Sequence, residues 1–149
     1  MIKKTHLAVG LALSLIFLPH VSHKLLFIPI VLFASLLPDI DSAYSSLGHI
    51  KVFRPLQWFV KHRGLIHSFT FCAIVSIALT LIWPGLGLPF FIGYFGHLLA
   101  DSFTIEGVAP FWPLKREVRG KFRTGGAIEE GLFLGLVLLN VVLFASWFI

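Results

Sequence analysis

The sequence predicts an all-α, polytopic membrane protein: a helical bundle with about five membrane-embedded helices. Hydrophobic residues make up 57% of the 149 residues, against about 45–50% in ordinary soluble domains. The excess lies in five apolar runs, and positive charges fall in alternate connections between them. We expect residues 1–149 to form a single membrane-embedded domain, because too little sequence remains outside the runs for a large soluble core.

The five apolar runs differ in length, and a crossing helix needs about 20 residues. The third and fifth runs suffice alone, whereas the fourth needs its polar flanks. The first two, joined by "PHVSHK", predict either two tight spans or a short re-entrant hairpin, which is tolerated only when it is buried in protein or lines a wet cavity. In chain order the runs are Leu7–Leu18, Leu25–Leu37, Leu65–Trp83, Leu88–Ala100 and Leu132–Ile149.

The first 22 residues resemble a secretory signal peptide, because Lys3 and Lys4 precede an apolar stretch. The region where cleavage would occur reads "FLPHVSH" and lacks an A-x-A-like site. We therefore expect a retained helix.

Lysine and arginine predict the orientation. They occur before the first run, between the second and third, and between the fourth and fifth, while the opposite connections carry only Lys24 and, in "PGLGLP", no cation. By the positive-inside rule the N-terminus and both basic loops face the cytoplasm. A hairpin or two full spans at the start give the same result.

Two stretches of the basic loops mix cations with aromatic residues: "IKVFRPLQWFVK" and "PFWPLKREVRGKFR". Such stretches lie at headgroup level and attract anionic lipids. We therefore interpret the net charge of +5 as an orientation signal and expect membrane lipids, not nucleic acid, as partners. Plain anchoring, with no role in binding a substrate, is the simpler interpretation of both stretches.

Histidines and acids gather on the predicted cytoplasmic side, and every apolar run contributes some of them. Any one of them near a helix end can simply reach water, but scattered polar residues would not sort to one side in this way. His20 and His23 fall on the other side. The gathered residues are His6, Asp39, Asp41, His62, His67, His97, Asp101, Glu129 and Glu130.

Two pairs among these residues have informative spacing. His97 and Asp101 are four apart, so both can face one point from a helix. Asp39 and Asp41 follow Pro38 at the carboxyl end of the second run, where the helix dipole disfavours anions and the two charges repel unless a cation is near. A hydrogen-bonded histidine and two solvated aspartates are the plainer interpretations of each pair by itself.

Histidine nitrogen combined with carboxylate oxygen favours a divalent metal: zinc first, with iron or manganese as alternatives. His62 and His67 can converge if the third helix starts near Gly64 or Leu65, which would place His67 in its first turn. Arg63 suits binding of phosphate or carboxylate, or anchors the helix on the positive side. The chain has no H-E-x-x-H, G-x-S-x-G or P-loop motif, so those mechanisms lose support.

At these residues the sequence resembles the YdjM-like family of membrane-bound, predicted metal-dependent hydrolases of bacteria and archaea, which implies a bacterial or archaeal inner membrane. The motifs that carry the resemblance are "THLAVG", "LLPDIDS", "HRGLIHSF", "GHLLADSFTIEGVAPFWPLKR" and "RTGGAIEEG". The resemblance implies an inner-membrane helical protein, and some bacterial members are associated with LexA control and the SOS response. It leaves open whether Glu129 or Glu130 points inward, since Gly126 stands where serine is expected. It implies a site made of His6, Asp39, Asp41, His62, His67, His97, Asp101 and Glu129.

The leading hypothesis is a metal-dependent hydrolase that acts at the cytoplasmic face on a phosphoester of a lipid or lipid-linked substrate. Asp41 or Glu129 is a further ligand or the general base, and Arg63 stabilises an anionic group. A metal or proton transporter is the alternative, and a structural scaffold is a third. The expected metal ligands are His6, Asp39, His62, His67, His97 and Asp101.

Overall fold

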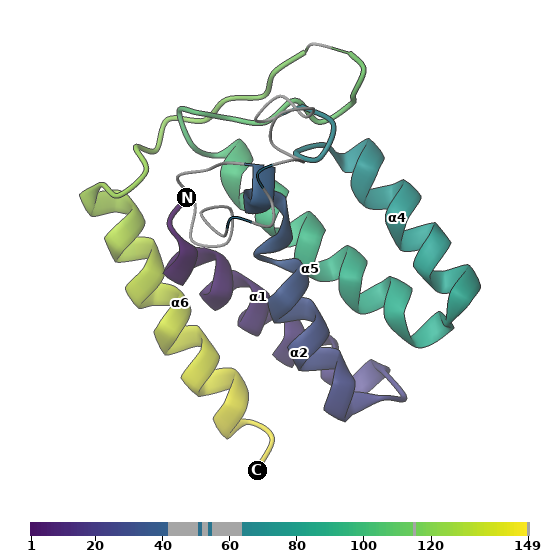
Figure 1. The fold of residues 1–149 in the computed structure, drawn as a ribbon. Coiled ribbons are helices and arrows are strands. Elements are labelled where there is room, and N and C mark those ends of the chain that lie inside the picture. The colour runs from purple at the N-terminus through teal and green to yellow at the C-terminus, as the bar shows by residue number, and fades with distance from the viewer. Residues whose placement is uncertain (42–50, 52–53, 55–63, 115, 149) are drawn as a thin grey trace.

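The computed structural model describes residues 1–41, 51, 54, 64–114 and 116–148. The described part is helical, without strands, and contains five α-helices and two short 3₁₀ turns (Figure 1). The all-α prediction is therefore confirmed for this part of the chain. In order the elements are α1 (Lys3–Phe17), η1 (Leu18–His20), α2 (Lys24–Ala34), η2 (Leu37–Asp41), α4 (Phe69–Ile82), α5 (Pro84–Ser102) and α6 (Ala127–Ala145).

The connection between α4 and α5 differs from the sequence prediction. The stretch "PGLGLP", expected as a loop, forms the first turns of α5, which begins at Pro84 one residue after Trp83 caps α4. Proline is favoured at the first position of a helix because its missing N–H would have no helical partner there. At Gly87 a Cβ would lie 1.8 Å from Thr80 Oγ1, so only glycine lets the two helices meet so closely.

Helix α4 begins at Phe69, four residues later than the predicted run. Ser68 caps it, with its Oγ accepting a hydrogen bond from Phe71 N at 3.1 Å. The placement of His67 in the first turn is therefore wrong: it lies in the turn that precedes the helix. That turn is held to α5, because Tyr94 Oη donates to the Ile66 carbonyl at 2.6 Å.

Helix α5 is the centre of the bundle. It packs against α1, α2 and α4, while α6 packs on α1 at the edge (Figure 1). A Cβ at Gly93 would lie 2.2 Å from the Val31 carbonyl oxygen, and one at Gly96 would lie 2.6 Å from Leu13. Small residues let membrane helices approach this closely. Gly93, which faces the backbone of α2, therefore sets how closely α2 lies on α5, whereas Gly96 faces only side-chain atoms of α1, the nearest at the end of Leu13.

The chain between α5 and α6 folds back on the end of α5. Isolated bridges join Thr104 to Phe122 and Val108 to Val118. The second of the predicted interfacial stretches lies here, whereas most of the first lies outside the described residues.

Among the described residues, α6 is the one helix both long and apolar enough to cross a membrane, while α4 is apolar but has only 14 residues. Helices α1 and α2 are short, with 15 and 11 residues. The count of five membrane-embedded helices stays a prediction.

Candidate metal site

Three histidines and three aspartates among the described residues meet at one end of the bundle. His6 lies near the start of α1, Asp39 and Asp41 in η2 after α2, and His67 just before α4. His97 and Asp101 lie in the last turns of α5. These ends lie together beside the N-terminus of the chain (Figure 1). The predicted grouping on one side is thus observed for these described residues.

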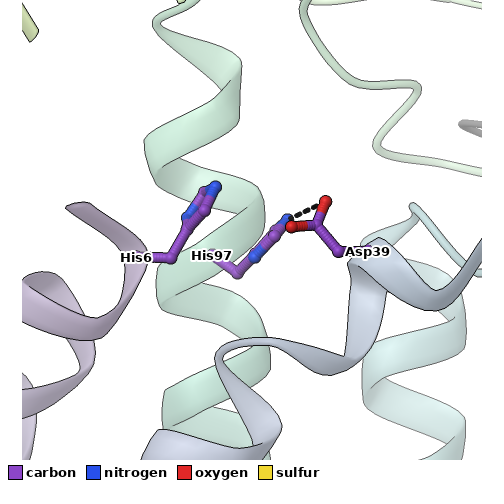
Figure 2. Close-up of side chains that lie close together, drawn as sticks. All are labelled: His6, Asp39 and His97. Carbon is purple, nitrogen blue, oxygen red and sulfur yellow. Dashed lines mark ion pairs between the residues drawn. The ribbon is translucent and has the colours of Figure 1, made fainter. Parts of the chain in front are cut away.

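His6, Asp39 and His97 form the first group. Each offers one ligand atom, and these atoms lie within 4.8 Å of one another. Figure 2 shows the three side chains converging from three different elements. The rings of His6 and His97 stack with centroids 3.7 Å apart, and His97 Nε2 lies 3.8 Å from Asp39 Oδ1.

His67, His97 and Asp101 form a second group that shares His97 with the first. Asp101 lies at the meeting point of the three histidines. Its Oδ2 lies 3.4 Å from His67 Nε2 and 3.6 Å from His97 Nε2, and its Oδ1 lies 3.3 Å from His6 Nε2. The amino group of Met1 also contacts Asp101. The two groups are therefore parts of one buried cluster.

The proton of a neutral His97 is placed by the backbone. Nδ1 lies 2.7 Å from the Ser35 carbonyl oxygen, which can only accept, so Nδ1 carries hydrogen. Nε2 then presents a lone pair, and it is buried without a hydrogen-bond partner among the described residues. The Ser35 carbonyl reaches His97 because α2 sits so close to Gly93. A ligating histidine is commonly oriented in this way through its other nitrogen.

His67 lies between two carboxylates. Nδ1 is 3.2 Å from Asp41 Oδ2, and Nε2 faces Asp101. Burial lowers the pKa of His67, but hydrogen bonds to Asp101 and Asp41 outweigh it and raise that pKa to about 9. Burial raises the pKa of Asp39. The cluster thus binds positive charge, which a proton or a metal ion supplies.

The spacing of the donors fits a metal ion. Bonds of about 2.0–2.2 Å in a tetrahedral zinc site place the ligand atoms about 3.3–3.6 Å apart. The nitrogen–oxygen distances in the cluster are close to this range: 3.4 and 3.6 Å to Asp101 Oδ2, 3.3 Å to Asp101 Oδ1, and 3.8 Å from His97 Nε2 to Asp39 Oδ1. Both ring nitrogens of His6, like His97 Nε2, are buried and lack a hydrogen-bond partner in the described part. Buried ring nitrogens beside carboxylates, such as His6 Nε2 and His97 Nε2, are the kind of donor that binds a metal ion.

Glu129 lies apart from both groups. It is buried, and its two carboxylate oxygens accept hydrogen bonds from Ile2 N at 2.7 Å and Gly125 N at 2.6 Å. Glu130 is exposed and pairs with Lys4 at 2.6 Å. Of the two acids it is therefore Glu129 that points inward. Through these two hydrogen bonds Glu129 joins the start of α1 to the start of α6. Its role as general base stays a prediction.

Two other predicted residues, His62 and Arg63, lie outside the described residues. Sequence reasoning also missed three positioning residues: Ser35, Tyr94 and Gly93. The small residues spaced along α5 were the available signal for Gly93. A backbone carbonyl such as that of Ser35 has no signature in a sequence, because any residue carries one.

Comparison with known proteins identifies the family. A model of the YdjM inner membrane protein family matches residues 1–149. The chain is 32% identical over 126 residues to "Inner membrane protein YdjM" of Escherichia coli (strain K12) and to the protein of that name from Shigella flexneri. The match covers 76% of this chain and 64% of each relative, so the chain spans less than two thirds of their length. No solved structure matches it. The names of the relatives support a membrane location, and the chain belongs to the YdjM family of inner membrane proteins.

Proposed function

We propose that this protein is a membrane-bound, metal-dependent hydrolase. One observation carries the proposal: the buried Nε2 of His97 has no hydrogen-bond partner among the described residues, is held in its tautomer by Ser35, and faces the carboxylates of Asp39 and Asp101. A lone pair aimed at two carboxylates is unfavourable unless a cation lies between them.

The residues that would hold the metal are His6, Asp39, His67, His97 and Asp101, with His62 as a further predicted ligand. Zinc fits their nitrogen and oxygen donors best, with iron or manganese as alternatives. A divalent metal here would supply Lewis-acid chemistry, polarising a phosphoryl or acyl oxygen and making water nucleophilic near neutral pH.

The remaining groups hold and orient the ligands. The Ser35 carbonyl orients His97, and Asp41 orients His67 through Nδ1, the arrangement that raises ligand basicity in metal sites. We therefore assign Asp41 the role of positioning His67, in place of the role of general base. The side chain of Asp39 is 19% exposed, against 2% or less for Asp41 and Asp101, so water and substrate would enter beside Asp39.

The substrate we propose is a phosphoester of a lipid or lipid-linked molecule. The cluster lies where the helices end, the depth at which headgroups lie. The basic chain between α5 and α6 folds over the same end and would attract an anionic headgroup. By the charge rule this end faces the cytoplasm.

The transporter alternative has less support, because a transport path needs polar groups through the membrane. Away from the cluster, the polar side chains of α4 turn back on their own helix: Ser76 Oγ donates to the Cys72 carbonyl at 2.7 Å and Thr80 Oγ1 to the Ser76 carbonyl at 2.8 Å. In α6, Asn140 donates to the Ala8 carbonyl at 3.0 Å. Within the described residues these groups support a site at one end over a path.

The test is metal analysis of protein purified in detergent without chelators. We expect bound zinc, iron or manganese in the wild type and its loss in His97→Ala and Asp101→Ala. His20→Ala, at the opposite end of the bundle, is the matched control and should keep the metal. Metal-free wild-type protein would overturn the proposal. Metal flux into liposomes without hydrolysis of any lipid phosphoester would favour the transporter.

A further inference from the structure

An apolar groove runs between α1, α5 and α6 on the side of the bundle next to the cluster. Its volume is about 370 Å³, within the range of about 300–1,000 Å³ of small-molecule sites. The walls of the groove include Val9, Gly96, Leu99, Phe103, Leu132 and Leu136.

The groove and the cluster lie on adjoining faces of α5. Gly96 and Ala100 line the groove, and each directly precedes a cluster residue, His97 or Asp101. Neighbouring residues on a helix point about 100° apart. A molecule in the groove therefore lies on the side of α5 that adjoins the cluster. A second, larger groove between α1, α2 and α6, of about 720 Å³, is lined by Leu7, which directly follows His6, but by no neighbour of His97 or Asp101 in sequence.

One end of the groove is formed by a residue of the basic loop. Phe122 lines this end, and the backbone holds it there: Phe122 N donates to the Phe103 carbonyl at 3.1 Å, and Ile105 N donates to the Phe122 carbonyl at 2.9 Å. Lys121 and Arg123 flank Phe122 in sequence, and both are exposed. The groove is thus apolar along its walls, and the loop segment at its end carries two exposed cations, which favours a lipid with an anionic headgroup.

The size of the groove decides between a lipid chain and a protein helix. A helix is about 10 Å wide with its side chains, and one turn of it would already fill this volume. A hydrocarbon chain is thin enough to lie along the groove. We infer that the groove holds one hydrocarbon chain of an anionic phospholipid and sets its phosphoester beside Asp101; only the second part rests on the proposed function.

The test is photolabelling in vesicles of phosphatidylglycerol that carries a diazirine in one acyl chain, with the adducts mapped by mass spectrometry. We expect adducts at Leu99, Leu132 and Leu136. The variants Leu136→Trp and Leu99→Trp fill the groove from opposite walls and should reduce these adducts about tenfold, because a filled pocket excludes the chain. Val141→Trp, on the wall of the larger groove, is the matched control and should leave them unchanged.

Two outcomes would overturn the inference. One is uniform labelling of every exposed face of α6 that neither groove-filling variant changes. The other is labelling of the groove in phosphatidylcholine vesicles that equals the labelling in phosphatidylglycerol vesicles, which would show that the groove does not select an anionic headgroup. Labelling needs neither metal nor hydrolysis. If the wild-type protein is metal-free but is still labelled in the groove, the proposed function is wrong and the inference that the groove binds a lipid chain stands.

Discussion

Helices α5 and α6 have the same length, 19 residues, but opposite surroundings. Eleven residues of α5 are buried, against two of α6. In α5 the buried residues include His97 and Asp101, whereas most of α6 faces outward with leucine, valine and phenylalanine. One helix builds the site, and the other presents an apolar surface suited to lipid.

Their glycines differ in the same way. A Cβ at Gly93 or Gly96 of α5 would collide with neighbouring helices, whereas one at Gly131 or Gly135 of α6 would meet nothing within 4 Å. Close packing requires small residues, and a polar cluster requires ionisable ones. A helix that builds a site therefore loses the continuous apolarity by which a membrane span is recognised, which is why α6 passes that test and α5 does not.

The largest expected effect is a change in stability when a tightly packed glycine of α5, and not an open glycine of α6, is replaced by alanine. Gly93→Ala should lower stability by about 3 kcal/mol, because the new Cβ would meet backbone atoms that cannot move aside. Gly135→Ala should raise stability by up to about 1 kcal/mol, since it adds helix propensity in open space. Thermal unfolding in detergent measures both. Equal shifts for the two variants would contradict the contrast between the helices.

The next largest effect concerns the end of α6. Glu129→Ala should lower stability by about 2–3 kcal/mol, because the Glu129 carboxylate holds two backbone N–H groups. Glu130→Ala, which removes an exposed ion pair with Lys4, should cost less than about 1 kcal/mol. Denaturation of both variants in the same detergent compares them. A larger loss for Glu130→Ala would mean that the start of α6 is held by its surface pair.

A third prediction concerns Asp41 and tests whether it orients a metal ligand or is itself one. Asp41→Asn should weaken metal binding about tenfold without abolishing it, because loss of an orienting carboxylate commonly has this effect. Competition with a metal-binding dye measures the affinity, with Asp101→Asn as the comparison that should lose the metal. If both variants lose the metal completely, Asp41 is a ligand.

The smallest effect is expected at Asn140, the other buried residue of α6. Its Nδ2 donates to Ala8, while its Oδ1 is buried without a partner in the described part. Asn140→Leu should change stability by less than about 1 kcal/mol, because a hydrogen bond between membrane helices averages about 0.6 kcal/mol and the orphaned oxygen is removed with it. Thermal unfolding measures the shift, and Leu139→Ala serves as a size control. A loss of several kcal/mol would show that α6 depends on this contact.

The sequence predicted most of the helices and the end of the bundle at which the cluster lies. Apolar runs locate helices because lipid and helix cores require them, and the spacing of His97 and Asp101 places both on one face. The α4–α5 connection was mispredicted, because Gly87 and Pro84 are typical of a loop until the packing of Thr80 against the helix is known.

By itself the sequence determined which residues reach the cluster end, since a residue's distance from a helix end depends only on its position in the chain. Tertiary structure decided the rest: that Glu129 and not Glu130 turns inward, that His67 precedes its helix, and that the Ser35 carbonyl accepts from His97 Nδ1, so that Nε2 faces Asp39 and Asp101. These outcomes depend on how far each helix is rotated and how closely it approaches its neighbours. Rotation and approach are set by contacts between distant segments, such as Gly93 against Val31, which the periodicity of a single helix does not contain.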